Sequence, residues 1–495
     1  MMLLSSGLKL SRRSDNAMSD PQIVWSQYQT AIFDEVCNGT GSLSIIARAG
    51  ASKSTTIVEA INRLSKLRSS TNRPNILVAA FGKAIQQDLE QKIQKSYITI
   101  RTIHSLGLQT LKENLGTIQI TPNKAEVMAR ELHPKLGVED TYLLTKTLGL
   151  CKSTLTDIPS RIDELMDRYS ITPIDLDREQ FIKSIAKMMR ISKDRKTFVD
   201  YNDMVWLVNV LCLKPKKPFD ICFLDEMQDV GRGTLQVILS SMAEKHRIIA
   251  AGDDLQTLFS FAGIDIDNVS QIQKRIKGSV LTLPISYRCP KAVIMLAKAY
   301  AKDITASPNA IQGSIHNITA NELIEYAKPG CFVLSRNNAS MIRPCMEFIR
   351  ADIKANIKGR DIGEGLTYLI KKSKTKTLES FLTWLEAWKI SETKRCLDKA
   401  RSTAWIADKH ECLIELSSGA KTLDDVQSNI KKLFTDVDDE DKVVFSTVHQ
   451  AKGLERENVF LLHWTFHPEK NQEEANITYV AITRSKNRLY FVEKD

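Results

Sequence analysis

The chain has 495 residues and a formal net charge of +10, with 43% hydrophobic and 26% charged residues. This length supports several domains with their own cores, and the composition is typical of a soluble globular protein, which excludes collagen-like and disordered chains. The positive charge favours a polyanionic partner, although many basic proteins bind none.

Three further features narrow the class of protein. The apolar runs are short and interrupted, so we expect no membrane partner. An apolar patch precedes two arginines near the start, which is the wrong order for a secretory signal, so we expect a disordered extension over residues 1–22 and an intracellular protein. The nine cysteines are scattered without a C-x-x-C pair, which suits a reducing compartment and argues against a zinc ribbon.

The first half of the chain alternates helical and strand-like patterns over residues 23–284. This alternation predicts an α/β unit with a parallel sheet and covering helices. Residues of about 107–199 show helix patterns and few strand signals, which predicts a helical insertion. The expected helices of the α/β part lie at 30–37 and 57–67, and its expected strands at 42–49, 75–81, 219–226 and 247–254.

A second α/β unit is predicted over residues 285–495. Its middle, at about 365–432, is charge-rich with helical spacing, which predicts a second helical insertion. The sequence thus predicts two parallel-sheet units, each with a helical insertion. The expected strands of the second unit lie at 331–336, 442–449, 458–464 and 489–495.

A segment after the first predicted strand partly matches a phosphate-binding loop. The P-loop pattern is G-x-x-x-x-G-K-[ST], and residues 47–54 read ARAGASKS. Lys53 and Ser54 fill the last two places, whereas Ala47 and Ser52 replace the two glycines. The loop alone therefore leaves open whether it is a working ATP site, a decayed one or a coincidence.

Two acidic residues follow the apolar strand at 219–224. Asp225 and Glu226 stand where the carboxyl end of that strand is expected, and ligands of open α/β sheets bind at this edge. An ATP site needs an acidic residue for Mg²⁺ and a group that positions the attacking water. The alternative is a solvated turn, which the nearby P-loop-like segment disfavours.

The order and spacing of several segments resemble the UvrD/Rep/PcrA-like helicases of superfamily one, from about residue 25 to the C-terminus. Each segment alone is modest support, but eight or more in the right order are very specific. The segments are WSQYQTAI, ARAGASKST, VAAFGKAIQQDL, RTIHSLG, VDYNDMV, LDEMQD, AGDDLQTLFSFAG, ISYRCP, STVHQAKGLERENVFLL and YVAITRSKNRLYFV.

The resemblance implies two RecA-like domains of the P-loop NTPase type, with ATP and Mg²⁺ as cofactors. Charge on the transferring phosphoryl group would be stabilised by arginines from both sides of the cleft. The implied roles are adenine reading by Gln29 and stacking by Tyr287; phosphate binding by Ala49, Gly50, Ala51, Ser52, Lys53, Ser54 and Thr55; Mg²⁺ binding by Ser54 and Asp225; catalytic base for Glu226; γ-phosphate sensing for Gln256; arginine fingers for Arg288 and Arg484; and ribose contact for Glu455.

On the DNA side, the resemblance implies a basic groove with aromatic faces on which bases stack. The implied stacking residues are Phe81, Phe259 and Phe261, although alternating aromatics such as the last two are also typical of a core. The implied backbone or base contacts are His104, Arg336, Thr447 and His449.

The sequence departs from the family pattern at several positions. Arg48 and Ser52 replace glycines of the loop, Ala262 replaces an arginine, and Asn476 replaces another common arginine. These changes affect the expected turnover and DNA coupling more than family membership, because every phosphate-directed charge named above is present.

We therefore expect an ATP-dependent helicase or translocase that acts on single-stranded DNA and single/double-strand junctions, with 3′→5′ movement. Replication, repair or recombination proteins are the expected protein partners, and the oligomeric state is left open. One alternative is a catalytically weak ATP-binding clamp or protein-displacing factor on single strands; another is an unrelated P-loop enzyme such as a kinase. A metal site at His463 and His467, four residues apart, lacks an evident third ligand.

Overall fold

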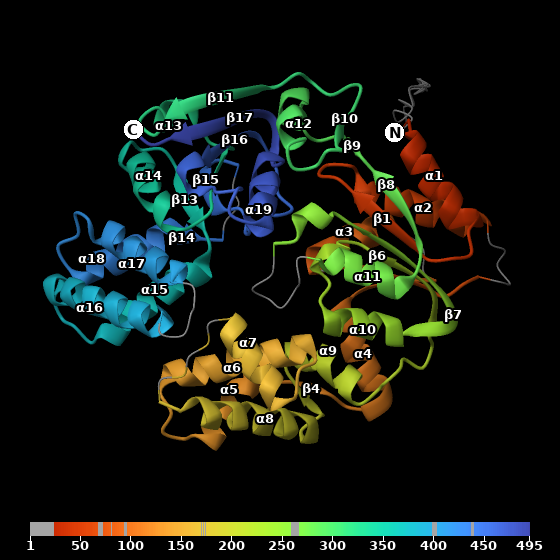
Figure 1. The fold of residues 1–495 in the computed structure, drawn as a ribbon, viewed down its shortest axis with the longest axis horizontal. Helices are drawn as coiled ribbons and strands as arrows, with labels where there is room; N and C mark the ends of the chain where they lie inside the picture. The colour runs from red at the N-terminus through yellow and green to blue at the C-terminus, as the bar shows by residue number, and fades with distance from the viewer. Residues whose placement is uncertain are drawn as a thin grey trace, which may run out of the picture.

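The computed structural model describes residues 24–495 except 68–72, 81, 94–96, 170, 172, 174, 259–266, 398–402 and 437–439. The expected disordered extension at 1–22 lies outside the described residues, as do Phe81, Phe259, Phe261 and Ala262. Within the described residues, no helix has the length and apolarity needed to cross a bilayer. The ribbon shows two sheet-containing bodies, each with a helical group attached (Figure 1).

A six-stranded parallel sheet forms the first body, in the order β3-β2-β6-β7-β1-β8. Its central strands are almost entirely apolar because both of their faces are buried. The strands are β1 (Leu43–Ala47), β2 (Ile76–Ala80), β3 (Ile98–Thr102), β6 (Phe219–Leu224), β7 (Met242–Gly252) and β8 (Ser279–Leu283).

Side chains alternate between two cores along these strands. Ile76 and Val78 pack in one cluster, and Leu77 and Ala79 in the other. The first cluster is covered by α1 (Gln27–Asn38), α2 (Lys53–Leu67) and α3 (Lys83–Lys92); the second by α4 (Ile103–Leu115), α9 (Tyr201–Val210), α10 (Arg232–Ser240) and α11 (Asn268–Ile276).

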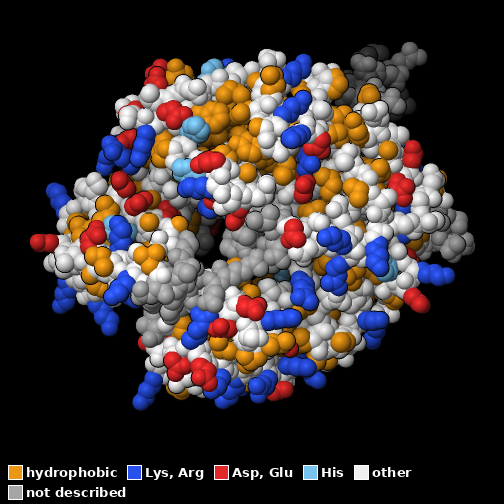
Figure 2. Space-filling model, in the orientation of Figure 1, with side chains coloured by type: hydrophobic (Ala, Val, Ile, Leu, Met, Phe, Trp, Pro, Cys, Tyr) orange, Lys and Arg blue, Asp and Glu red, His pale blue; other side chains and the backbone are white. Residues whose placement is uncertain are grey.

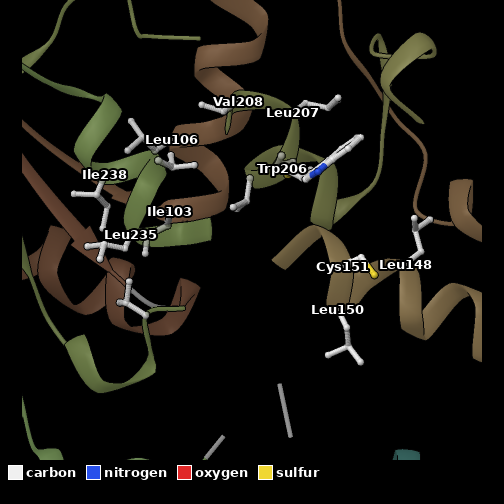
Figure 3. Packing of buried hydrophobic residues seen from close by; sticks show 14 of the residues in the cluster. Ile103, Leu106, Leu148, Leu150, Cys151, Trp206, Leu207, Val208, Leu235 and Ile238 are labelled. Atoms are coloured by element: carbon white, nitrogen blue, oxygen red, sulfur yellow. The ribbon is translucent and has the colours of Figure 1, made fainter. Parts of the chain in front are cut away.

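A helical group continues from the second face of this sheet. In Figure 3, Trp206, Leu207 and Val208 of α9 lie between the side chains of α4 and α10 and those of α6. The sheet core and the helical group therefore share one hydrophobic cluster. The group contains α5 (Lys124–Leu132), α6 (Val138–Thr154), α7 (Pro159–Arg168) and α8 (Arg178–Asp194), with a two-stranded pair of β4 (Gln119–Ile120) and β5 (Phe198–Val199).

A seven-stranded parallel sheet forms the second body, in the order β11-β17-β16-β12-β15-β13-β14. The strands are β11 (Ser314–Thr319), β12 (Phe332–Ser335), β13 (Ala355–Lys358), β14 (Phe434–Thr435), β15 (Val443–Thr447), β16 (Arg456–Leu462) and β17 (Ser485–Glu493). The short strands β9 (Ile285–Ser286) and β10 (Thr305–Ala306) pair with each other between the two bodies in sequence.

Helices cover both faces of the second sheet. One face packs against α13 (Leu323–Tyr326), α14 (Ala339–Arg350) and the helical group α15 (Arg360–Ser373), α16 (Leu378–Leu397), α17 (Ala404–Ser417) and α18 (Leu423–Leu433). The other face packs against α12 (Lys291–Ala297) and α19 (Gln472–Ile482). The two-unit α/β prediction is confirmed, while the predicted domain limits stay a prediction.

The two bodies share one hydrophobic cluster. Ala49 of the loop after β1 and Leu258 after β7 are buried among residues of β12, β15, β16 and α19. In the first sheet, the segments that meet the second body follow the carboxyl ends of β1 and β7. The junction therefore lies where ligands of open α/β sheets bind.

Candidate nucleotide site between the two bodies

The loop between β1 and α2 curls without the glycine that its pattern expects. Gly50 and Ser52 have φ of 72° and 54°, so both occupy the left-handed region. A side chain at residue 50 would meet Cβ of Arg288 at 2.5 Å and Oγ of Ser286 at 2.7 Å, which makes glycine necessary there. Ser52 adopts the strained conformation instead, at a cost of about 1–2 kcal/mol.

This loop leads directly into the N-terminus of α2, which begins at Lys53. Successive backbone N–H groups in such a curl, together with the positive end of the helix dipole, form an anion-binding concavity. The backbone geometry of a phosphate cradle is therefore present, despite Ala47 and Ser52.

Lys53 lies against the two carboxylates that follow β6. Its Nζ is 3.2 Å from Oδ1 of Asp225 and 2.5 Å from Oε2 of Glu226. Burial alone would lower the pKa of Lys53, but the two carboxylates outweigh burial and raise it. Burial likewise opposes the charge on Glu226, yet Lys53 and Gln228 bring the pKa of Glu226 down to about 2. Both groups are therefore charged at neutral pH.

Ser54 and Asp225 are positioned to share a cation. The Ser54 hydroxyl donates to Oδ2 of Asp225 at 2.8 Å, and the Asp225 side chain is almost fully buried. A hydroxyl and a carboxylate are hard oxygen ligands of the kind Mg²⁺ prefers. The donor set thus fits an Mg²⁺–nucleotide complex held by Lys53 and the loop.

Gln29 and Tyr287 lie 258 positions apart in the chain and are brought together by the fold. Gln29 is the third residue of α1, and its side chain donates to Oγ1 of Thr56 at 3.1 Å. The Tyr287 hydroxyl donates to Oε1 of Gln29 at 3.3 Å, and Tyr287 is 42% exposed. An exposed ring beside a fixed amide is a suitable surface for a planar base.

Gln256 lies in a polar network at the end of β7. Its side chain donates to Oδ2 of Asp253 at 2.8 Å, and its carbonyl accepts from Nζ of Lys452 at 2.8 Å. Lys452 belongs to the second body and also lies 2.6 Å from Oδ1 of Asp229. Burial raises the pKa of Asp229 to about 6 in spite of Lys452. Gln256 is thus bonded to groups from both bodies.

Of the two predicted arginine fingers, Arg288 follows β9 and packs against Gly50 of the phosphate loop, and Arg484 directly precedes β17 of the second body. Arg288 forms an ion pair with Glu455, the predicted ribose contact. Arg484 is fully buried, and its Nε donates to the Val480 carbonyl at 2.9 Å. Its Nη2 has no hydrogen-bond partner among the described residues. Burial and the nearby Arg288 lower the pKa of Arg484 to about 10, so it remains charged at neutral pH.

Two of the predicted DNA contacts, Arg336 and Thr447, lie at the carboxyl ends of the neighbouring strands β12 and β15, and a third, His449, follows Thr447 closely in the chain. Thr447 ends β15, and its register partner is Ser335, next to Arg336. Arg336 pairs with Glu474 at 3.0 Å. Burial, with the Arg336 and Lys452 cations, lowers the pKa of His449 to about 4. Figure 2 shows lysine and arginine side chains mixed with acidic ones over the visible face rather than in one uniform patch.

His104 lies apart from these three, in the first turn of α4. Its ring centroid is 6.5 Å from that of Tyr201, and burial lowers its pKa. The roles of all these residues in binding DNA stay predictions. His463 is bonded to Glu493 at 2.6 Å, and the described residues hold no cluster of three metal-ligating side chains.

Comparison with known proteins agrees with this arrangement. The profile of the UvrD/REP helicase N-terminal domain matches residues 28–277, and that of the UvrD-like helicase C-terminal domain matches residues 371–494. The chain belongs to the UvrD/Rep helicase family. The predicted family resemblance is confirmed, and so are the two parallel-sheet domains that it implied.

Individual UvrD/Rep helicases are distant in sequence. The chain is 21% identical to DNA helicase IV of Escherichia coli (strain K12) over 57% of this chain and 48% of that protein. It is 22% identical to the ATP-dependent DNA helicase PcrA of Bacillus subtilis (strain 168), over 53% of this chain and 38% of that protein. The chain therefore spans about half or less of the length of these curated relatives.

The structure also assigns residues to the site of this UvrD/Rep helicase chain that the sequence analysis did not. The Tyr479 hydroxyl accepts from the backbone N–H of Ala49 at 3.0 Å and donates to Oδ2 of Asp253 at 3.3 Å. Lys452 and Asp229 cross the same junction. Tyr479, Asp253, Lys452 and Asp229 all lie within the family motif segments of the sequence. Their position in these motifs was the sequence feature that could have identified them.

Proposed function

We propose that this chain is an ATP-dependent DNA helicase or translocase that moves on single-stranded DNA in the 3′→5′ direction. The observation that carries the proposal is the bonded cluster of Lys53, Ser54, Asp225 and Glu226, beside a phosphate loop against which Arg288 packs at Gly50. The relatives' names, DNA helicase IV and ATP-dependent DNA helicase PcrA, support DNA as the substrate.

In the proposed reaction, the curled loop and Lys53 bind the ATP phosphates. Lys53 exchanges its present carboxylate partners for phosphate oxygens, and Ser54 and Asp225 hold the Mg²⁺. Bound Mg²⁺ neutralises charge on the phosphate oxygens. Glu226, released from Lys53, is then free to orient the attacking water and accept its proton.

Two arginines at the junction of the bodies complete the reaction. Arg288 and Arg484 supply positive charge to the transferring phosphoryl group, where guanidinium groups act most strongly. Arg288 must first release Glu455, so hydrolysis depends on a rearrangement at the junction. A cleft that must close for chemistry and reopen for product release is how a hydrolysis cycle drives stepping.

The strand would run over the carboxyl ends of both sheets. Arg336, Thr447 and His449 contribute from the second body and His104 from the first, with Phe81, Phe259 and Phe261 as stacking residues outside the described part. Single/double-strand junctions are the proposed site of unwinding, and replication, repair or recombination proteins are the proposed partners.

A second candidate is a catalytically weak clamp that holds single strands or displaces proteins from them. Ser52 and Arg48 favour it, since both replace glycines in the phosphate loop. The clamp would bind ATP and DNA with the same residues but would hydrolyse ATP too slowly to move.

Strand displacement separates the two candidates. Duplexes with a 3′ or a 5′ single-stranded tail are incubated with ATP, Mg²⁺ and either the wild type or Glu226→Gln. We expect ATP-dependent displacement from the 3′-tailed duplex, lost in the variant. Displacement from the 5′-tailed duplex alone would reverse the polarity. Tight DNA binding without displacement on either substrate would favour the clamp.

A further inference from the structure

Arg48 turns away from the phosphate loop and is fixed by three carboxylates. Its Nη1 lies 3.1 Å from Oδ1 of Asp253 and 2.6 Å from Oδ1 of Asp254, and its Nε lies 2.7 Å from Oδ1 of Asp303. The Arg48 side chain is only 12% exposed. A residue that departs from the family pattern is therefore enclosed by acidic partners of its own.

The first of these carboxylates connects Arg48 to the catalytic network. Asp253 accepts from Gln256 at 2.8 Å and from the Tyr479 hydroxyl at 3.3 Å. Its backbone N–H donates to Oε1 of Gln228, whose amide in turn bonds Glu226. Asp253 thus bonds Gln256 and the second body directly, and it is connected to Glu226 through Gln228.

The third carboxylate belongs to the second body. Asp303 lies between Ala301 and Ile304, which are buried in the same cluster as β12, β15 and α19. The Asp303 side chain is 44% exposed, so it is held mainly by Arg48. The ion pair between Arg48 and Asp303 consequently joins the phosphate loop to the second body.

We propose that Arg48 is a positioning residue that ties the phosphate loop, the Gln256 segment and the second body into one closed arrangement. The inference rests on the proposed function for its kinetic consequence only. A glycine at residue 48 would leave the phosphate loop free to move relative to the second body. Arg48 instead fixes the relative position of the loop, the Gln256 segment and the second body before nucleotide binds. The cleft is thereby biased toward the closed state that brings Arg288 and Arg484 to the reaction.

The ion pair between Arg48 and Asp303 is best tested by substituting Asp303, because Asp303 is the more exposed partner. Asp303→Asn removes the ion pair between Arg48 and the second body while leaving Arg48 paired with Asp253 and Asp254. Asp163→Asn is the matched control, because Asp163 is 45% exposed and pairs with Arg178 inside the first helical group. Arg48→Gly restores the glycine of the family pattern and removes all three ion pairs, but it leaves the buried carboxylate of Asp253 without its arginine partner.

The first readout is hydrogen exchange without nucleotide, which does not depend on activity. We expect Asp303→Asn to speed exchange about fivefold or more at the backbone amides of Ala49, Gln256 and Tyr287, which lie in loops at the junction. Asp163→Asn should leave these amides unchanged. Equal exchange in wild type and Asp303→Asn would overturn the proposal, whether or not the chain hydrolyses ATP.

The second readout is steady-state ATP hydrolysis with single-stranded DNA. Asp303→Asn should lower kcat at least about threefold while the Kd of a fluorescent ATP analogue changes less than twofold, since the residues that bind the phosphates are untouched. Adding Asp303→Asn to Arg48→Gly should lower kcat no further, because one link has already been lost. Additive losses, or a wild-type kcat in Asp303→Asn, would contradict the proposed positioning. An inactive wild type would instead reject the proposed function and leave hydrogen exchange to decide the link.

Discussion

At the scale of single residues, the phosphate loop keeps the backbone conformation of a P-loop although its sequence does not match the P-loop pattern. The P-loop pattern has glycine at residue 52 because the backbone there has a positive φ, and Ser52 adopts φ of 54° all the same. Gly50 cannot be replaced in this way because its Cα faces Arg288 and Ser286. The pattern thus specifies glycine at residue 52, where serine is accommodated, and leaves residue 50 unspecified, where the structure requires glycine.

Ser52→Gly should stabilise the protein. Relief of the left-handed strain, about 1–2 kcal/mol, exceeds the extra chain entropy of glycine, about 0.5–1 kcal/mol. We expect the free energy of unfolding in urea to rise by up to about 1.5 kcal/mol. Ser65→Gly, within α2, should lower it by about 0.5–1 kcal/mol as the control. A loss of stability in Ser52→Gly would show that the loop is unstrained.

His449 should make stability depend on pH. Its pKa in the folded chain is about 4, below the unfolded value of about 6.5, so the unfolded chain binds more protons between these values. The stabilisation that comes from His449 being buried in its neutral form is therefore lost as the pH falls through this range. The free energy of unfolding should decrease by about 2 kcal/mol between pH 7 and pH 5. Urea unfolding at both pH values should show a smaller loss in His449→Gln. The comparison with the variant cancels the opposite effect of Asp229, whose pKa is raised. Parallel pH dependence in the two proteins would contradict the burial of His449.

At the scale of elements, strand prediction succeeded where both faces of a strand are buried. β1, β2, β6, β12 and β15 are short apolar runs, and each was expected from the sequence. The edge strands β3, β8 and β11 were not predicted. β8 and β11 in particular are largely solvent-exposed, so neither has an apolar run. A hydrophobic pattern in the sequence indicates that a strand is buried. An exposed edge strand forms through backbone hydrogen bonds with its neighbour, so it can lack such a pattern.

Buried charges hold the first helical group together. Nζ of Lys152 lies 2.6 Å from Oδ1 of Asp203 and 3.1 Å from Oδ2 of Asp200, and Nζ of Lys124 lies 2.6 Å from Oδ2 of Asp203. Asp200 also caps α9. The network joins α5, α6 and α9, and its carboxylates come from the VDYNDMV segment, whose helix-capping role the sequence motif did not predict.

Lys152→Met should destabilise the first helical group strongly. Removing one partner of a buried ion pair leaves an uncompensated charge and costs about 3–5 kcal/mol. Lys92→Met, which breaks an exposed pair with Asp88, should cost less than about 1 kcal/mol. The urea midpoints of the two variants check this difference. Similar midpoints would mean that the buried network contributes no more than a surface pair.

At the scale of the whole molecule, the candidate site is divided between two bodies. Lys53, Asp225 and Glu226 come from the first body, and Arg484 and Lys452 from the second. Motif order on the sequence was sufficient to assign these residues to one family. It could not show that Arg48 bonds Asp253 and Asp303, because these residues lie 205 and 255 positions away and only folding brings them together.

The most direct test of the account is steady-state ATP hydrolysis with and without single-stranded DNA, beside Lys53→Ala. If the divided site is a motor, DNA should raise kcat by about tenfold or more, and the variant should lose this activity because the phosphates lose their lysine. DNA binding with hydrolysis no faster than that of Lys53→Ala would contradict the motor and leave a clamp.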